Sequence, residues 1–179
     1  KNYNVIRVGD ELAEALEAQG ISVLHDREIY DYPSYTGSYS RSGAAVESYL
    51  AQHPNIAIVI DLHRDALGDG EVTYKTVAEL DGTASSQLMM LVGTGESGLY
   101  HPNWEQNLRF ALRLQSALHT KYEGLVRPLY LVDSRYNQHL TNGSLLIEVG
   151  SDSNTVEEAV YSGQLLGKTL AQVLDELKS

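Results

Sequence analysis

Two runs of apolar residues, at 56–62 and 145–147, give the strongest hydrophobic signal in the chain. The first is broken only by Asp61 and leads into His63, and the second leads into Glu148. Strands of this composition are typical of the middle of a sheet that is covered on both faces. Because catalytic and binding groups gather at the carboxyl ends of such strands, the pattern predicts that His63 and Glu148 share a site.

Helical periodicity predicts four helices around these two strands. They are expected at 5–20, at 40–52, at 103–122 and from Thr155 to about residue 178. Thr155 followed by Glu158 has the spacing of a capping box, which predicts where the last helix begins. Glycine at residues 20 and 124 suits the ends of the first and third helices.

Further strands are predicted at 21–24 and 125–132. Pro128 favours an edge position or a bulge for the second of these, because proline lacks an amide donor. Asp81-Gly82 is a strong hairpin signal. It lies between two segments that are expected to form antiparallel strands, 72–80 and 87–92.

This alternation predicts a single domain over residues 1–179, with a three-layer α/β/α sandwich on a mixed, mostly parallel sheet. A doubly wound fold normally opens on a strand, whereas this chain opens on a helix. We therefore expect that the fold lacks its first strand here, and that this strand lies upstream of Lys1.

The amino-acid composition restricts the possible partners, metal ligands and catalytic groups. The formal charge of −11 would repel phosphate backbones, so nucleic acid is not expected as a partner. The absence of cysteine leaves His, Asp and Glu as possible metal ligands. No apolar run approaches the roughly 20 residues of a membrane span, so no membrane segment is expected in this chain. Neither a Gly-x-Ser-x-Gly elbow nor a phosphate-binding loop is present.

His63 and Glu148 each have a functional and a structural interpretation. A neutral imidazole is a good zinc ligand, but a histidine at a strand end is also a common hydrogen-bonding residue. Burial would raise the pKa of Glu148 toward neutrality, as a general base requires. Alternatively, Glu148 forms a salt bridge with Arg64 or Arg41, or accepts hydrogen bonds from the turn at 150–151.

Four further residues are candidates for binding a substrate. His139 precedes Glu148 by nine residues in a loop, and Arg64 follows His63 directly. Tyr32 and Tyr35 belong to a tyrosine-rich loop that could line a groove for a sugar or a peptide. A solvated histidine and exposed tyrosines would give the same pattern, so both interpretations stay open.

Four segments in order, 31–41, 60–66, 101–104 and 146–150, resemble the stage II sporulation protein P family. This family belongs to the zinc-dependent N-acetylmuramoyl-L-alanine amidases of endospore-forming bacteria, and the similarity covers essentially the whole chain. The resemblance implies an amidase fold and cleavage of the amide between N-acetylmuramic acid and the stem peptide of peptidoglycan. It also implies a second, endopeptidase activity on peptide cross-links.

The resemblance implies roles for individual residues and partners as well. His63, in Asp-Leu-His-Arg-Asp, would be a zinc (Zn2+) ligand, and Glu148, in Ile-Glu-Val-Gly, the catalytic carboxylate. The family's other two ligands lie in a segment upstream of the opening helix, so we expect them before Lys1 and expect this chain alone to be inactive. Stage II sporulation proteins D and M would be partners during engulfment. Location would be extracytoplasmic, with a membrane anchor outside this chain.

Two other functions remain open on the sequence. One is a zinc carboxypeptidase or amidohydrolase that acts on small peptides. The other is a non-catalytic module that binds the cell wall.

Overall fold

The computed structural model describes residues 3–177. Its helices are α1 (Tyr3–Glu17), α2 (Ser38–Gln52), α3 (Trp104–Lys121) and α4 (Val156–Glu176), with short 3-10 turns η1 (Gly95–Ser97) and η2 (Gln138–Leu140). Its strands are β1 (Val59–Asp65), β2 (Val77–Leu80), β3 (Thr83–Ser86), β4 (Leu88–Gly93), β5 (Tyr130–Val132) and β6 (Ser144–Ser151). All four predicted helices are present. The predicted C-terminal limit of α4, residue 178, lies outside the described residues.

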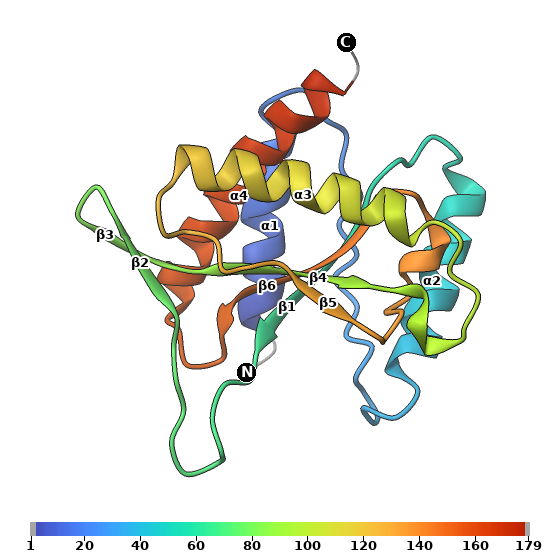
Figure 1. Cartoon of the computed structure of the whole chain (residues 1–179), viewed down its shortest axis with the longest axis horizontal. Helices are drawn as coiled ribbons and strands as arrows, with labels where there is room; N and C mark the ends of the chain where they lie inside the picture. The colour runs from blue at the N-terminus through green and yellow to red at the C-terminus, as the bar shows by residue number, and fades with distance from the viewer. Residues whose placement is uncertain (1–2, 178–179) are drawn as a thin grey trace.

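The main sheet has the strand order β1-β6-β4-β5. β1 pairs with β6 and β4 with β5 in parallel, whereas β4 and β6 are antiparallel. Helices α1, α3 and α4 lie together against one face of the sheet (Figure 1). The other face stays partly open to solvent, since the His63 and Asp61 side chains on it are 37% and 39% exposed. The predicted α/β fold on a mixed, mostly parallel sheet is therefore confirmed.

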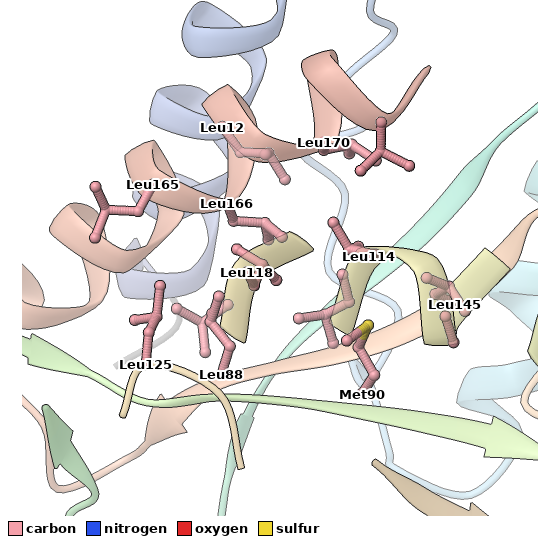
Figure 2. Close-up of a cluster of buried hydrophobic side chains, with 14 of the residues drawn as sticks. Leu12, Leu88, Met90, Leu114, Leu118, Leu125, Leu145, Leu165, Leu166 and Leu170 are labelled. Carbon is pink, nitrogen blue, oxygen red and sulfur yellow. The ribbon is translucent and has the colours of Figure 1, made fainter. Parts of the chain in front are cut away.

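The core lies between the sheet and the layer of α1, α3 and α4 (Figure 2). Alternate residues of β4 and β6 enter it, because successive side chains of a strand point to opposite faces. Leu88, Met90, Leu145 and Ile147 are each at most 1% exposed. Leu118 of α3 is fully buried against them. This apolar layer fixes the strands whose opposite face carries His63 and Glu148.

Local signals explain two of the connections. The capping box of α4 forms as predicted, with Thr155 Oγ1 accepting from the Glu158 amide and the Glu158 side chain accepting from the Thr155 amide. Asp81 and Gly82 have φ values of 51° and 78°. A hairpin turn of type I′ requires positive φ at both central residues, and Asp-Gly supplies it.

Three strand predictions need correction. No strand forms at 21–24, because Ile21 and Val23 pack against the core without a neighbouring strand to pair with. The hairpin is β2 with β3, a separate two-stranded sheet, and the following β4 pairs with β6 instead. The strand predicted at 125–132 is reduced to β5, which lies at the edge of the sheet, as Pro128 indicated.

The position of β1 is also different from the prediction. β6 is an interior strand, but β1 lies at an edge of the sheet that the described residues form. Its apolar residues Ile60 and Leu62 pack against the core, so their hydrophobicity reports a covered face. Hydrophobicity does not report whether both strand edges are paired, which explains why the sequence suggested an interior position.

Candidate active site

His63 and Glu148 meet on adjacent strands. They are direct partners in the register of the parallel pair β1 and β6. Neighbouring strands lie about 4.8 Å apart, and directly paired residues point to the same face. The two side chains therefore share the face of the sheet opposite the helical core, as the sequence predicted.

A bulge in β6 follows directly after this pair. Between His63 and Asp65 the register shifts, so that two steps along β1 correspond to three along β6, ending at Ser151. Gly150 lies in the shifted stretch with a φ of 64°. A Cβ there would lie 2.5 Å from Oδ1 of Asn154, which only glycine avoids. Bulges of this kind reorient side chains near functional sites.

His63 is oriented by a neighbour on its own strand. Its Nε2 lies 3.0 Å from Oδ1 of Asp61, which points to the same face two residues earlier. Burial lowers the pKa of His63, but the hydrogen bond to Asp61 and the charges of Asp61, Glu148 and Asp31 outweigh it, so the pKa is raised overall. A carboxylate that holds one ring nitrogen leaves the other, Nδ1, free to bind a ligand.

Glu148 lacks the partners that a withdrawn carboxylate normally has. Its Oε2 is buried and accepts no hydrogen bond from the residues that the structure describes. Burial is the main cause that raises its pKa to about 7, and Asp65 and Asp61 add to the effect, whereas His63 and Arg127 oppose it. A carboxyl group with this pKa is poised to accept and return a proton near neutral pH.

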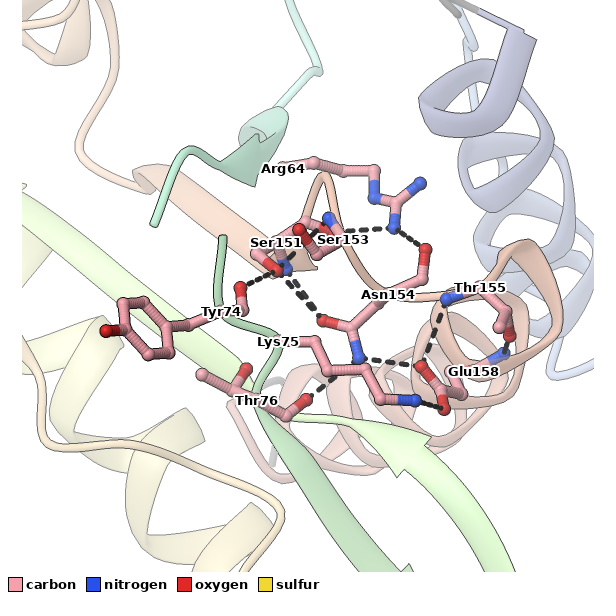
Figure 3. A network of polar contacts seen from close by, with 9 residues as sticks. All are labelled: Arg64, Tyr74, Lys75, Thr76, Ser151, Ser153, Asn154, Thr155 and Glu158. Carbon is pink, nitrogen blue, oxygen red and sulfur yellow. Dashed lines mark hydrogen bonds and ion pairs between the residues drawn. The ribbon is translucent and has the colours of Figure 1, made fainter. Parts of the chain in front are cut away.

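Neither arginine that the sequence suggested as a partner for Glu148 contacts it. Arg64 points to the opposite face, where its Nη2 donates to the carbonyl oxygens of Ser151 at 2.6 Å and Asn154 at 2.5 Å (Figure 3). Arg41 donates to three carbonyls of the preceding loop, those of residues 30, 34 and 36. The salt-bridge alternative for Glu148 is therefore wrong. The structure also does not bring Arg64, a candidate for substrate binding, to this face.

The other substrate-binding candidates lie around the site at different distances from its centre. Tyr32 and Tyr35 are 79% and 73% exposed in the loop that leads into α2. The same loop carries Asp31, whose charge reaches His63. His139 lies in η2, and its neighbours are Arg135, His101 and Glu47 rather than His63 or Glu148. The loop therefore borders the site, and His139 belongs to a separate cluster.

Three residues near this face, Asp65, Arg127 and Tyr39, were not among the predicted site residues. Asp65 forms an ion pair with Arg127, with Nη1 and Oδ2 3.0 Å apart. Tyr39 of α2 has a pKa raised by burial and then by the charge of Asp61, and the charge of Glu148 adds to the effect. Its ring packs against Tyr136 with the ring centroids 5.2 Å apart. Asp65 and Asp61 follow from strand alternation around His63, but nothing local in the sequence indicates Arg127.

The described residues supply part of a metal site. His63 fits as one ligand, because Asp61 holds its Nε2 and no described residue forms a hydrogen bond with its Nδ1. A catalytic zinc takes three protein ligands and a water. Within residues 3–177, no group of three or more His, Cys, Asp or Glu side chains is arranged to hold a metal ion.

Sequence comparison gives a clear match. A family model described as "Stage II sporulation protein P (SpoIIP)" matches residues 1–171. Stage II sporulation protein P of Bacillus subtilis (strain 168) is 31% identical over an alignment of 166 residues, and the match covers 87% of this chain. The chain spans 39% of the length of that relative. In the part of the chain that the structure describes, no helix is long and apolar enough to cross a bilayer.

Structural comparison supports the same fold. The CwlD amidase from Clostridioides difficile, solved in complex with the GerS lipoprotein, has a TM-score of 0.61 at 15% identity, covering 97% of this chain and 84% of CwlD. The N-acetylmuramoyl-L-alanine amidase AmiC2 of Nostoc punctiforme has a TM-score of 0.56 at 13% identity, covering 98% and 83%. For the apo amidase Ami1 from Mycobacterium abscessus the values are 0.56 and 15%, covering 97% and 76%. At these identities the similarity establishes the fold alone.

Proposed function

The chain belongs to the stage II sporulation protein P family, and we propose that it is the catalytic part of a peptidoglycan hydrolase. The bond cleaved is the amide between N-acetylmuramic acid and the L-alanine of the stem peptide. One observation carries the proposal: His63 and Glu148 are paired on an incompletely covered sheet face, and Glu148 keeps an unpartnered oxygen there. The three structural neighbours are amidases by name, which supports the choice of an amide bond.

The proposal includes a zinc ion, for which His63 would supply one ligand through Nδ1. When bound, the metal would polarise the amide carbonyl and make water a better nucleophile at neutral pH. The remaining protein ligands would come from residues other than those described, since only part of a donor set is present among them. Asp61 then serves to hold the imidazole in one orientation.

Glu148 handles the protons in this reaction. Its carboxylate accepts a proton from the attacking water, whose oxygen forms a bond to the carbonyl carbon. As the carbon–nitrogen bond breaks, Glu148 returns that proton to the departing nitrogen. The products are a carboxylic acid on the muramic acid and a free amino group on L-alanine. A pKa of about 7 allows the same group to accept and return a proton without a large energetic cost.

Three finer parts of the proposal rest on family membership. They are a second activity on peptide cross-links, a role in engulfment together with stage II sporulation proteins D and M, and extracytoplasmic location through an anchor elsewhere in the protein. CwlD was solved with a lipoprotein partner, which provides a precedent for partner binding on this fold. Each of these parts can fail without affecting the assignment of the bond that is cleaved.

Digestion of purified peptidoglycan tests the proposal. This chain and the longer protein that contains it should be incubated with sacculi and with small dipeptides, and new amino termini identified by labelling and mass spectrometry. We expect the longer protein, and not this chain alone, to release free L-alanine amino termini from sacculi, and we expect zinc in the longer protein that is lost in His63→Ala. Cleavage of dipeptides alone would favour a carboxypeptidase, and binding to sacculi without any cleavage would favour a cell-wall binding module.

A further inference from the structure

The Arg127 side chain extends onto the catalytic face from a backbone position near the opposite edge of the sheet from β1. The amide of Arg127 donates to the carbonyl of Leu88 at 2.8 Å, so its backbone lies beside the start of β4. Its guanidinium contacts Asp65, at the end of β1. β4 and β6 lie between these two positions in the strand order. The side chain therefore extends across both strands, past the position of Glu148, whose pKa its charge lowers.

Most N–H donors of the Arg127 guanidinium form no hydrogen bond with a described residue. Its side chain is 25% exposed, and only Nη1 forms a hydrogen bond to a described residue, Asp65. A guanidinium presents five N–H donors in a planar fork that matches a carboxylate. Its backbone is held on both sides, because Gln115 also donates to the Arg127 carbonyl at 2.9 Å. Arg127 is thus a positioned cation with unused donors at the rim of the site.

Three other basic side chains of this region, those of Arg41, Arg64 and Lys75, already form hydrogen bonds or ion pairs with other groups. Arg41 is bound to loop carbonyls and Arg64 to carbonyls on the opposite face. Lys75 is paired with Glu158 at 2.6 Å. The site itself holds the carboxylates of Asp61, Asp65 and Glu148, and the whole chain carries a formal charge of −11. An acidic substrate would be repelled from this face unless a cation received its negative charge.

We infer that Arg127 is a specificity-determining residue that binds a carboxylate of the stem peptide, and this inference rests on the proposed function. The spacing agrees with the α-carboxylate of the second stem residue, D-glutamate. Asp65 lies two residues beyond His63 along β1, which is about 6.6 Å in a strand. The α-carboxylate of the second residue lies about two residues, or roughly 7 Å, from the scissile amide nitrogen. A substrate amide held at His63 and Glu148 would thus place this carboxylate beside Arg127.

Two ligands that differ at this one group provide the test. N-acetylmuramoyl-L-alanyl-D-glutamate carries the α-carboxylate, and N-acetylmuramoyl-L-alanyl-D-isoglutamine carries an amide in its place. Binding of each is measured by titration calorimetry to the full 179-residue chain with Glu148→Gln, which prevents turnover. We expect the acid to bind about tenfold more tightly than the amide, as for one charge-assisted hydrogen-bonded contact.

Arg127→Gln should abolish the preference for the acid, and Arg127→Lys should keep part of it, because lysine retains the charge without the fork. Arg109→Gln is the matched control, since it removes the same charge from an exposed position on α3, against the opposite face. It should keep the full preference. Equal binding of the two ligands by the Glu148→Gln protein would overturn the role of Arg127, even if Arg127→Gln failed to fold. A preference that persists in folded Arg127→Gln would overturn it as well. Binding of neither ligand by any of these proteins would overturn the proposed function together with this inference.

Discussion

Glu148 and Glu158 are both withdrawn from solvent, yet their surroundings differ completely. Glu158 accepts hydrogen bonds from Lys75 at 2.6 Å, from Asn154 at 2.8 Å and from the Thr155 amide at 3.0 Å (Figure 3). Burial alone would raise its pKa, but these bonds outweigh burial and lower it. Glu148 keeps an unpartnered oxygen and a pKa of about 7. The satisfied carboxylate stabilises the fold, and the unsatisfied one remains available for chemistry.

The network around Glu158 shows what the satisfied carboxylate does. Asn154 also donates to the carbonyl of Thr76, and the Ser151 hydroxyl donates to the carbonyl of Tyr74. These contacts fasten the segment after β1 to the turn between β6 and α4 (Figure 3). The bulge beside Glu148 lies in the same part of β6. One polar network therefore supports the backbone from which the other carboxylate projects.

The same substitution at the two positions should have opposite consequences, and its largest effect should be on activity. In a form of the protein that cleaves sacculi, Glu148→Gln should reduce the rate of amide cleavage by about 10³-fold, because it removes the proton acceptor and keeps the side-chain shape. Glu158→Gln should leave the rate per folded molecule within about threefold. Release of L-alanine amino termini from sacculi measures both. Comparable losses at the two positions would remove the functional distinction between them.

Stability should respond in the reverse order. Glu158→Gln should lower the free energy of unfolding by about 2–3 kcal/mol, because it leaves Lys75 unpaired and weakens the cap of α4. The figure is below that for a fully buried pair, since the Lys75 side chain is 45% exposed. Urea unfolding at pH 7 of both variants and of the wild-type chain is the measurement. If Glu148→Gln is the more destabilised variant, the assignment of Glu158 as the structural carboxylate is wrong.

The free energy of unfolding should depend on pH because of the raised pKa of Glu148. Its pKa rises from 4.5 to about 7 on folding, so between these values the folded state binds a proton that the unfolded state has released. Stability from this group is therefore complete below pH 4.5 and is lost as the pH rises through about 7. The loss should be about 2 kcal/mol, and Glu148→Gln should not show it. The free energy of unfolding of the wild-type chain and of Glu148→Gln is measured from pH 5 to about pH 8. The same pH dependence in both proteins would contradict this expectation.

The exposed loop at the border of the site should give the smallest effect. Tyr32→Ala and Tyr35→Ala remove aromatic surface that lies next to the catalytic face without being packed in the core. Each should weaken binding to sacculi by about two- to fivefold, as expected for partial loss of an aromatic contact with a sugar or peptide. Tyr130→Ala is a control, since it is 59% exposed on the edge strand β5. Unchanged binding of the double variant Tyr32→Ala/Tyr35→Ala would show that the loop forms no groove for the glycan.

Local sequence signals identified the two carboxylates, Glu148 and Glu158, but not the residues that surround them. An apolar run that ends in a lone carboxylate indicated Glu148, and Thr155 with Glu158 indicated the capping box. The partners of these residues could not be predicted, because they come from distant parts of the chain. Lys75 is 83 residues from Glu158, and Arg127 is 62 residues from Asp65. Which of the two carboxylates is satisfied depends on the topology of the sheet.

Strand predictions failed for a related reason. Apolar alternation showed which residues face the core, but pairing at strand edges depends on the order of strands. The segment at 21–24 has a strand pattern and no pairing partner among the described residues, whereas β1 has an interior pattern at an edge position. Arg64 and His63 are adjacent in sequence and lie on opposite faces, as strand alternation requires. The side chain beside a catalytic residue in sequence is therefore the wrong place to look for its neighbour in the site.

Glu148 is an unsatisfied carboxylate that is available for proton transfer. The most direct test of this role is a titration of the glutamate side-chain carboxyl carbons by NMR, with Glu148→Gln and Glu158→Gln used to assign the two resonances. We expect an inflection near pH 7 for Glu148 and one below 4.5 for Glu158. An inflection for Glu148 at or below 4.5 would contradict this role, because the carboxylate would then be stabilised in its charged form and would be a poor proton acceptor.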